Sequence, residues 1–107
     1  MSLSLEEHLA VPYRLIVYSA PGPDGEWRRY AAYPELGCVS EGDTPMEAMD
    51  RLEEQRIRYI VEHLQKGEPI PVPRPPLRSL AAALDAERLA FARWLVETER
   101  LNETPGA

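Results

Sequence analysis

The feature that most constrains this fold is a run of prolines that divides the chain. Five prolines lie between residues 69 and 76. Because proline lacks an amide donor, this segment cannot be an interior strand or the middle of a helix. We predict an extended, polyproline-like crossover over residues 67–78, with separate structure before and after it. Such a run could also be a ligand for a domain with an aromatic groove.

The residues before the crossover begin with a predicted β-hairpin. The segment Tyr13–Ser19 is rich in β-branched and aromatic residues and is too short for a stable helix, so it predicts a strand. Asp24 and Gly25 tolerate the backbone conformations that a tight turn requires. The segment Trp27–Tyr33 then predicts the returning strand.

A short third strand over Cys38–Glu41 leads into a well-specified helix. Thr44 is a suitable N-cap, Pro45 fits the first helical turn, and Glu47 is spaced to complete a capping box. Gly67 supplies a stop, so the helix is predicted to run to Lys66. Its apolar positions form a stripe that Gln55 and Arg56 interrupt: Met49, Leu52, Ile57, Ile60, Val61 and Leu64.

The segment after the crossover is ambiguous. Residues Ser79–Ala86 predict a helical turn or two, with Leu80 and Leu84 facing inward. Residues Phe91–Thr98 fit two templates, because a helix would align Leu84, Phe91 and Leu95, whereas a strand would place alternate residues on opposite faces. The local pattern leaves both open.

The segment from Tyr33 to Met49, Tyr-Pro-Glu-Leu-Gly-Cys-Val-Ser-Glu-Gly-Asp-Thr-Pro-Met-Glu-Ala-Met, resembles the signature of the HicB-like antitoxin family. In that family a strand ends in a Pro-Glu-Leu-Pro-Gly-Cys-like turn, and a short strand, Gly-Asp-Thr and a helix opening with Glu-Ala-Leu follow. The segment Gly67-Glu-Pro-Ile-Pro71 resembles the family's usual helix exit. The likeness covers residues 13–73 and is to a short form of the family, without a DNA-binding C-terminal domain.

This resemblance implies an α+β fold, in which a three- to four-stranded antiparallel sheet packs against one long helix, similar to a pared-down RNase H fold. Residues 1–107 would form a single domain. Residues 13–66 would hold the hairpin, the third strand and the main helix, and residues 79–101 a short helix and a final strand. The resemblance therefore favours a strand for Phe91–Thr98, and it implies that the second face of the sheet, or an edge, is free for association.

Charge and hydropathy restrict the partners. The formal net charge is −6, and no segment is basic enough to bind phosphates, so direct nucleic-acid binding is disfavoured. An acidic surface suits a basic partner, although solubility explains it equally well. The N-terminus carries Glu6 and Glu7 where a signal peptide needs positive charge, and no apolar run approaches the roughly 20 residues that span a bilayer. We expect a cytoplasmic protein without a membrane segment.

The reactive side chains give little support for a catalytic function. Cys38 is the only cysteine, and beside Val39 on a short strand it is expected to be a core thiol rather than a nucleophile. His8 and His63 share no ligand spacing, so no metal or cofactor is expected. Four acidic residues invite comparison with a two-metal nuclease, but their places at strand ends and turns favour solvated side chains: Glu26, Glu35, Glu41 and Asp43.

We therefore expect a non-catalytic protein-binding module. The resemblance implies a partner, a small basic toxin that cleaves mRNA and is neutralised by occlusion. The alternative is an orphan interaction domain of the same fold that forms a homodimer or higher oligomer, and a nuclease with an RNase H-like site is a third hypothesis. Trp94 is either a core residue or an interface anchor. The residues expected to contact a partner are Glu35, Leu36, Glu41, Asp43 and Trp94.

Overall fold

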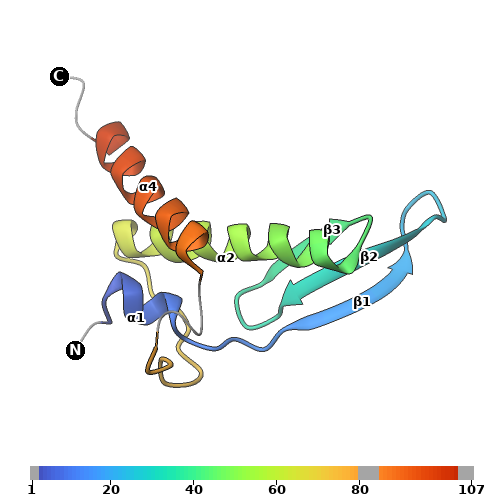
Figure 1. Cartoon of the computed structure of the whole chain (residues 1–107), viewed down its shortest axis with the longest axis horizontal. Helices are drawn as coiled ribbons and strands as arrows, with labels where there is room; N and C mark the ends of the chain where they lie inside the picture. Colours follow the sequence, from blue (N-terminus) through green and yellow to red (C-terminus); the bar gives the residue numbers. More distant parts are fainter. Residues whose placement is uncertain (1–2, 80–84, 104–107) are drawn as a thin grey trace.

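The computed structural model describes residues 3–79 and 85–103 and shows an α+β protein (Figure 1). A three-stranded antiparallel sheet lies against one long helix, with further helices toward the opposite end of that helix. Residues 68–79 form neither helix nor strand, as expected for the proline-rich crossover. The elements are α1 (Leu5–Leu9), β1 (Ile16–Pro21), β2 (Trp27–Tyr33), β3 (Cys38–Gly42), α2 (Pro45–Lys66) and α4 (Ala86–Glu103).

The predicted hairpin is confirmed, but its first strand is displaced along the chain. β1 and β2 pair from Ile16 opposite Ala32 to Pro21 opposite Trp27. The strand does not begin at Tyr13 because that side chain is drawn into the core, where its hydroxyl donates to the carbonyl oxygen of Pro71 at 2.8 Å. The hydrogen bond to the crossover therefore keeps Tyr13 out of the sheet, although its local β-propensity predicted a strand.

The long helix begins and ends where the sequence predicts. Thr44 is the N-cap, and its hydroxyl accepts from the amide of Glu47 at 3.1 Å. The Glu47 carboxylate pairs with Arg51, so the capping box is formed by its Thr44 half alone. Gly67 closes the helix in the left-handed conformation at φ 69°, which glycine adopts without steric cost.

Helix α2 packs closely on the sheet at its first turn. A Cβ atom on Gly42 would lie 2.8 Å from the amide nitrogen of Ala48, so only glycine permits this approach of β3 to α2. Ser40 on β3 also donates to the carbonyl oxygen of Ala48. In the predicted apolar stripe, Met49 and Leu64 are partly buried. The other four residues are fully buried: Leu52, Ile57, Ile60 and Val61.

The strand expected over Phe91–Thr98 is wrong, because these residues lie in helix α4. Ala92 and Leu95 are the buried positions, at 0% and 5% exposure, and their spacing of three is helical rather than alternating. Packing against α2 decided between two templates that were locally equal. Arg88 supports this packing by pairing with Asp50 of α2 at 2.7 Å. The predicted positions Leu80 and Leu84 lie outside the described residues.

A short N-terminal helix, α1, was not predicted. Ser4 and Glu7 form a complete capping box, in which the Ser4 hydroxyl accepts from the Glu7 amide and the Glu7 carboxylate accepts from the Ser4 amide. The end of α1 meets Arg56 of α2, whose guanidinium is 4% exposed and donates to the carbonyl oxygen of Leu9 at 2.9 Å.

Arg56 is part of a polar network that joins three elements. Its guanidinium also donates to the carboxylate of Glu53 at 2.7 Å, and the other oxygen of that carboxylate accepts from the hydroxyl of Tyr33 on β2. The polar interruption in the apolar stripe is therefore a buried connection between α1, α2 and the sheet.

We predict that Arg56→Ala lowers the free energy of unfolding by about 2–4 kcal/mol, since it leaves the Glu53 carboxylate without its cationic partner and the Leu9 carbonyl oxygen without its donor. The measurement is urea unfolding followed by circular dichroism. Arg58→Ala, two residues along the same helix, is the control; Arg58 is exposed and lies over the ring of Phe91, so its loss should cost about 1 kcal/mol or less. Equal losses for the two variants would contradict the prediction.

Candidate protein-interaction surface

One face of the sheet is left uncovered by the described elements. Helix α2 lies over the opposite face, where it contacts β2 and β3 (Figure 1). Cross-strand partners share a face of the sheet. Tyr18 and its partner Tyr30 lie on the uncovered face, and so do Ala32 and its partner Val39. Tyr18 and Tyr30 stack with ring centroids 5.2 Å apart, and Val39 is 53% exposed. This surface, the open face, comprises Ile16, Tyr18, Ala20, Arg28, Tyr30, Ala32, Val39 and Glu41.

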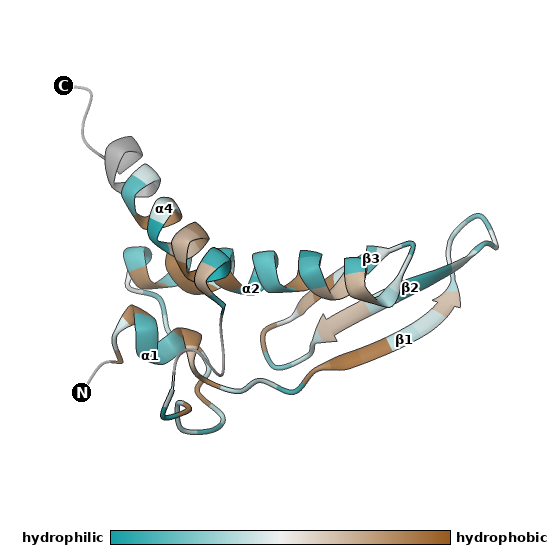
Figure 2. Ribbon diagram, viewed as in Figure 1, coloured by the Kyte–Doolittle hydropathy of each residue, from teal (hydrophilic) through white to brown (hydrophobic). Residues whose placement is uncertain are grey.

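Strand β1 lies at an edge of the sheet and is incompletely covered on its helix side as well. The strand order is β1-β2-β3, so β1 has one neighbour. Val17 pairs with the fully buried Ala31 and thus points to the helix side, yet it is 41% exposed. Figure 2 shows hydrophobic residues along the first half of β1. The cause is the position of α2, which packs mainly on β2 and β3.

A cleft of about 300 Å³ lies between the start of β1 and helix α2. Leu15 and Met46 contribute exposed apolar surface to it, at 46% and 65% exposure. Methionine side chains are flexible and fill irregular apolar surfaces, so this cleft can adapt to a partner's side chain. The lining residues are Leu15, Tyr33, Met46, Met49, Asp50, Glu53 and Arg88.

The phenols near this cleft are hydrogen-bond donors rather than reactive groups. Burial raises the pKa of Tyr33, and the hydrogen bond to Glu53 raises it further. Burial also raises the pKa of Tyr13 to about 12. Both hydroxyls therefore remain protonated at neutral pH, where they support the fold through Glu53 and the Pro71 carbonyl oxygen.

The structure gives Glu35 a definite structural contact. Its carboxylate accepts from the Arg74 guanidinium at 2.9 Å and from the Arg14 amide at 2.7 Å. These two hydrogen bonds, the first to the crossover and the second to the approach to β1, hold the pKa of Glu35 below its usual value. Glu35 thus joins two distant segments beside the turn after β2.

The other residues expected at a partner surface are not gathered into one site. Leu36 is 7% exposed and belongs to the core. Glu41 and Asp43 are exposed at the end of β3 and in the connection to α2. Trp94 is 55% exposed on α4, which packs on α2 rather than on the sheet. The structure therefore brings Glu41 and Asp43 to the same end of the sheet and places Trp94 elsewhere.

The reactive side chains considered in the sequence are dispersed. Burial raises the pKa of the Cys38 thiol, which disfavours the thiolate. His63 stacks on Tyr59 and lies 3.4 Å from the Glu68 carboxylate. Over residues 3–79 and 85–103, no three His, Cys, Asp or Glu side chains are grouped so that they could hold a metal ion. None of the helices in the described part of the chain is long and apolar enough to cross a membrane.

Sequence reasoning missed the open edge and the cleft. The sequence did not indicate which strand would form the free edge, and β1 forms one because residues 86–103 are helical and add no strand beside it. The sequence did not predict the exposure of Leu15 and Val17, because the β-propensity of this segment is equally typical of a buried strand. The Ser4–Glu7 capping box was the one local signal that could have revealed α1.

Comparisons with protein-family models, with curated proteins and with solved structures found no match for this chain.

We predict that Glu35→Gln lowers the melting temperature at neutral pH and has little effect in acid. The folded-state pKa of Glu35 is depressed, so its carboxylate stabilises the fold above the reference value of 4.5, and this contribution is lost as the pH falls through the folded-state pKa. Thermal unfolding of both proteins across the acid range tests this. Asp43→Asn is the matched control, since it removes one exposed carboxylate that forms no ion pair within the described residues; an equal effect of both substitutions at pH 7 would refute a specific role for Glu35.

Proposed function

We propose that this protein is a non-catalytic protein-binding module of the HicB-like type, which neutralises a small basic mRNA-cleaving toxin by covering it. The observation that carries the proposal is the open face of the sheet, where the stacked pair Tyr18 and Tyr30 lies near the exposed Val39. Exposed apolar and aromatic side chains at the centre of a surface are typical of protein-binding sites, because they release water and lose little conformational entropy on contact. The likeness of residues 33–49 to the HicB-like signature supports the same function.

Charge supports a basic partner. Glu41 faces the open side of β3, and Asp43 follows two residues later at the same end of the sheet. The chain as a whole carries a net charge of −6. Arg28 lies on the same face but is paired with Asp24. The acidic end formed by Glu41 and Asp43 would steer a basic toxin toward this face and favour its orientation, mainly through the association rate.

Occlusion requires shape and charge from this chain and no reacting group. The sheet supplies the shape, since α2 fixes β2 and β3 from behind through Ala31, Ser40 and Tyr33. A partner on the open face would meet a surface held by a packed core rather than by loops. Pre-organisation of this kind reduces the entropic cost of binding.

The test requires a small basic mRNA-cleaving toxin, sought in the gene adjacent to that of this chain, and its two measurements are RNA cleavage and calorimetry. We expect an equimolar amount of this protein to suppress cleavage. Val39→Lys, which places a positive charge in the open face, should weaken the complex by about tenfold or more, equivalent to about 1.4 kcal/mol. Val72→Lys is the matched control, because Val72 is similarly exposed but lies in the crossover.

Two results would refute this proposal. One is the absence of a complex with the toxin at micromolar concentrations of both folded proteins. The other is equal affinity for the wild-type chain and Val39→Lys, which would exclude the open face as the contact surface.

A further inference from the structure

Strand β1 is an edge strand with little protection against pairing, because Pro21 at its end is the single residue of the strand that removes an amide donor. It contains no charged residue between Ile16 and Pro21. Val17 and Tyr18 are 41% and 43% exposed on its two sides. Edge strands of natural proteins are commonly blocked by charged side chains, by bulges or by a covering element, because their free amide and carbonyl groups attract another strand. Within the described residues, β1 has β2 as its one strand neighbour.

A strand added at the β1 edge would find exposed side chains to cover on the helix side of the sheet. Leu15 and Val17 face this side and are both more than one-third exposed. They lie beside the cleft of about 300 Å³ to which Met46 also contributes. A strand paired with β1 would cover these side chains and send its own alternate side chains toward the cleft, as in strand-addition complexes.

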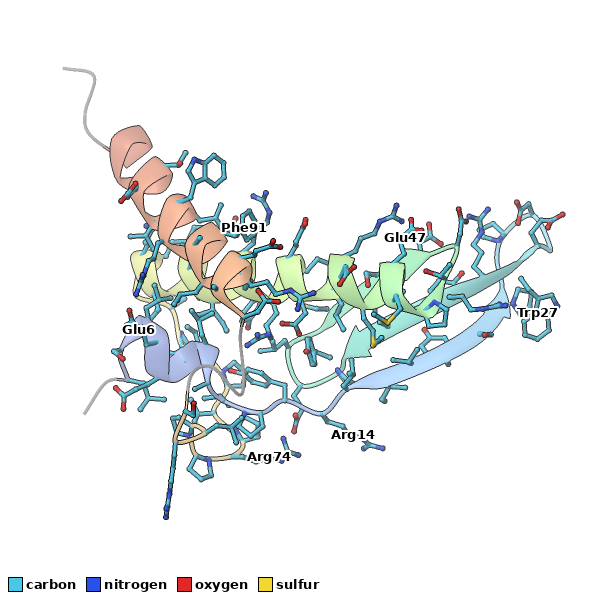
Figure 3. All side chains as sticks on the ribbon, viewed as in Figure 1. Glu6, Arg14, Trp27, Glu47, Arg74 and Phe91 are labelled. Carbon is cyan, nitrogen blue, oxygen red and sulfur yellow. The ribbon has the colours of Figure 1, made fainter. Side chains whose placement is uncertain are left out.

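An exposed positive side chain precedes β1 and an exposed negative one follows it, next to the ion pair of Asp24 with Arg28. Arg14 precedes the strand and is exposed, and Glu26 lies exposed in the hairpin loop that follows it. Neither side chain forms an ion pair with another described residue. Figure 3 shows Arg14 at the start of β1, directed away from the body of the protein, and Trp27, the neighbour of Glu26, at the opposite hairpin end.

This arrangement is complementary to itself. If two β1 strands run antiparallel about a two-fold axis, Arg14 of each copy approaches the hairpin end of the other, where Glu26 lies. The same axis brings the two sets of Leu15 and Val17 together, as an isologous interface requires. A basic partner would not be attracted to β1 in this way, because the strand is uncharged and the acidic residues Glu41 and Asp43 lie toward the other edge of the sheet.

We propose that two copies of this chain associate by antiparallel pairing of β1, near Val17 and Tyr18, to form a continuous six-stranded sheet. The two-fold axis is perpendicular to the sheet, so both α2 helices lie on one side and both open faces lie on the other. This dimer does not depend on the toxin proposal, and it would present two open faces on one continuous surface.

The first test is sedimentation of the full chain without any partner. The expected mass is twice that of the 12.1 kDa chain. Val17→Lys should shift the protein to the monomer, because the two lysines would meet near the axis and like charges on adjacent strands repel. Val39→Lys and Val72→Lys carry the same substitution at exposed valines away from this edge and should remain dimeric. Circular dichroism checks that each variant is folded.

The second test locates the contact without relying on a destabilising charge. In a Cys38→Ser background, Tyr18→Cys should be crosslinked into a dimer by a short bismaleimide reagent, whereas Val72→Cys should not. A monomer mass at every concentration would overturn the proposal, as would a dimer that Val17→Lys leaves intact and Tyr18→Cys fails to crosslink. A dimer lost in Trp94→Ala alone would place the interface on α4 and also overturn it. Because no toxin is present, these results are independent of the test of toxin binding.

Discussion

The buried guanidinium of Arg56 is the interaction on which the rest of the structure depends. A buried charge must be fully hydrogen-bonded, and the partners of Arg56 come from separate parts of the chain. The Leu9 carbonyl oxygen ties the end of α1 to α2, and Glu53 connects the same guanidinium to Tyr33 on β2. These contacts fix the direction in which the N-terminal segment enters β1, so a single polar residue sets both the packing of the ends and the approach to the sheet.

The position of α2 over β2 and β3 then determines which surfaces remain free. Tight packing at Gly42 and Ala48 draws the helix toward β3 and away from β1. The open face and the β1 edge are consequences of this one offset. Each proposal concerns one of these two surfaces. Toxin binding is proposed for the open face with its acidic end, and self-association for the uncharged β1 edge.

Local signals predicted the middle of the chain well. The hairpin, the third strand and α2 follow from β-propensity, turn residues, the Thr44 cap and the Gly67 stop, all of which act between near neighbours in sequence. The candidate site was less accessible to prediction. Glu41, Asp43 and Trp94 are exposed as a contact surface requires, but Leu36 is buried and Glu35 is engaged by Arg74, because neighbouring segments that pack around the turn decide their burial.

Residue type and short spacing are enough to account for the three strands, the long helix, the irregular crossover and the acidic charge. The tertiary structure decided the rest. Phe91–Thr98 became helical because Ala92 and Leu95 had α2 to pack against, and β1 began at Ile16 because Tyr13 found a partner at Pro71. The free edge at β1 is likewise a tertiary result. An edge is defined by which strand lacks a neighbour, and that depends on where every other element has packed.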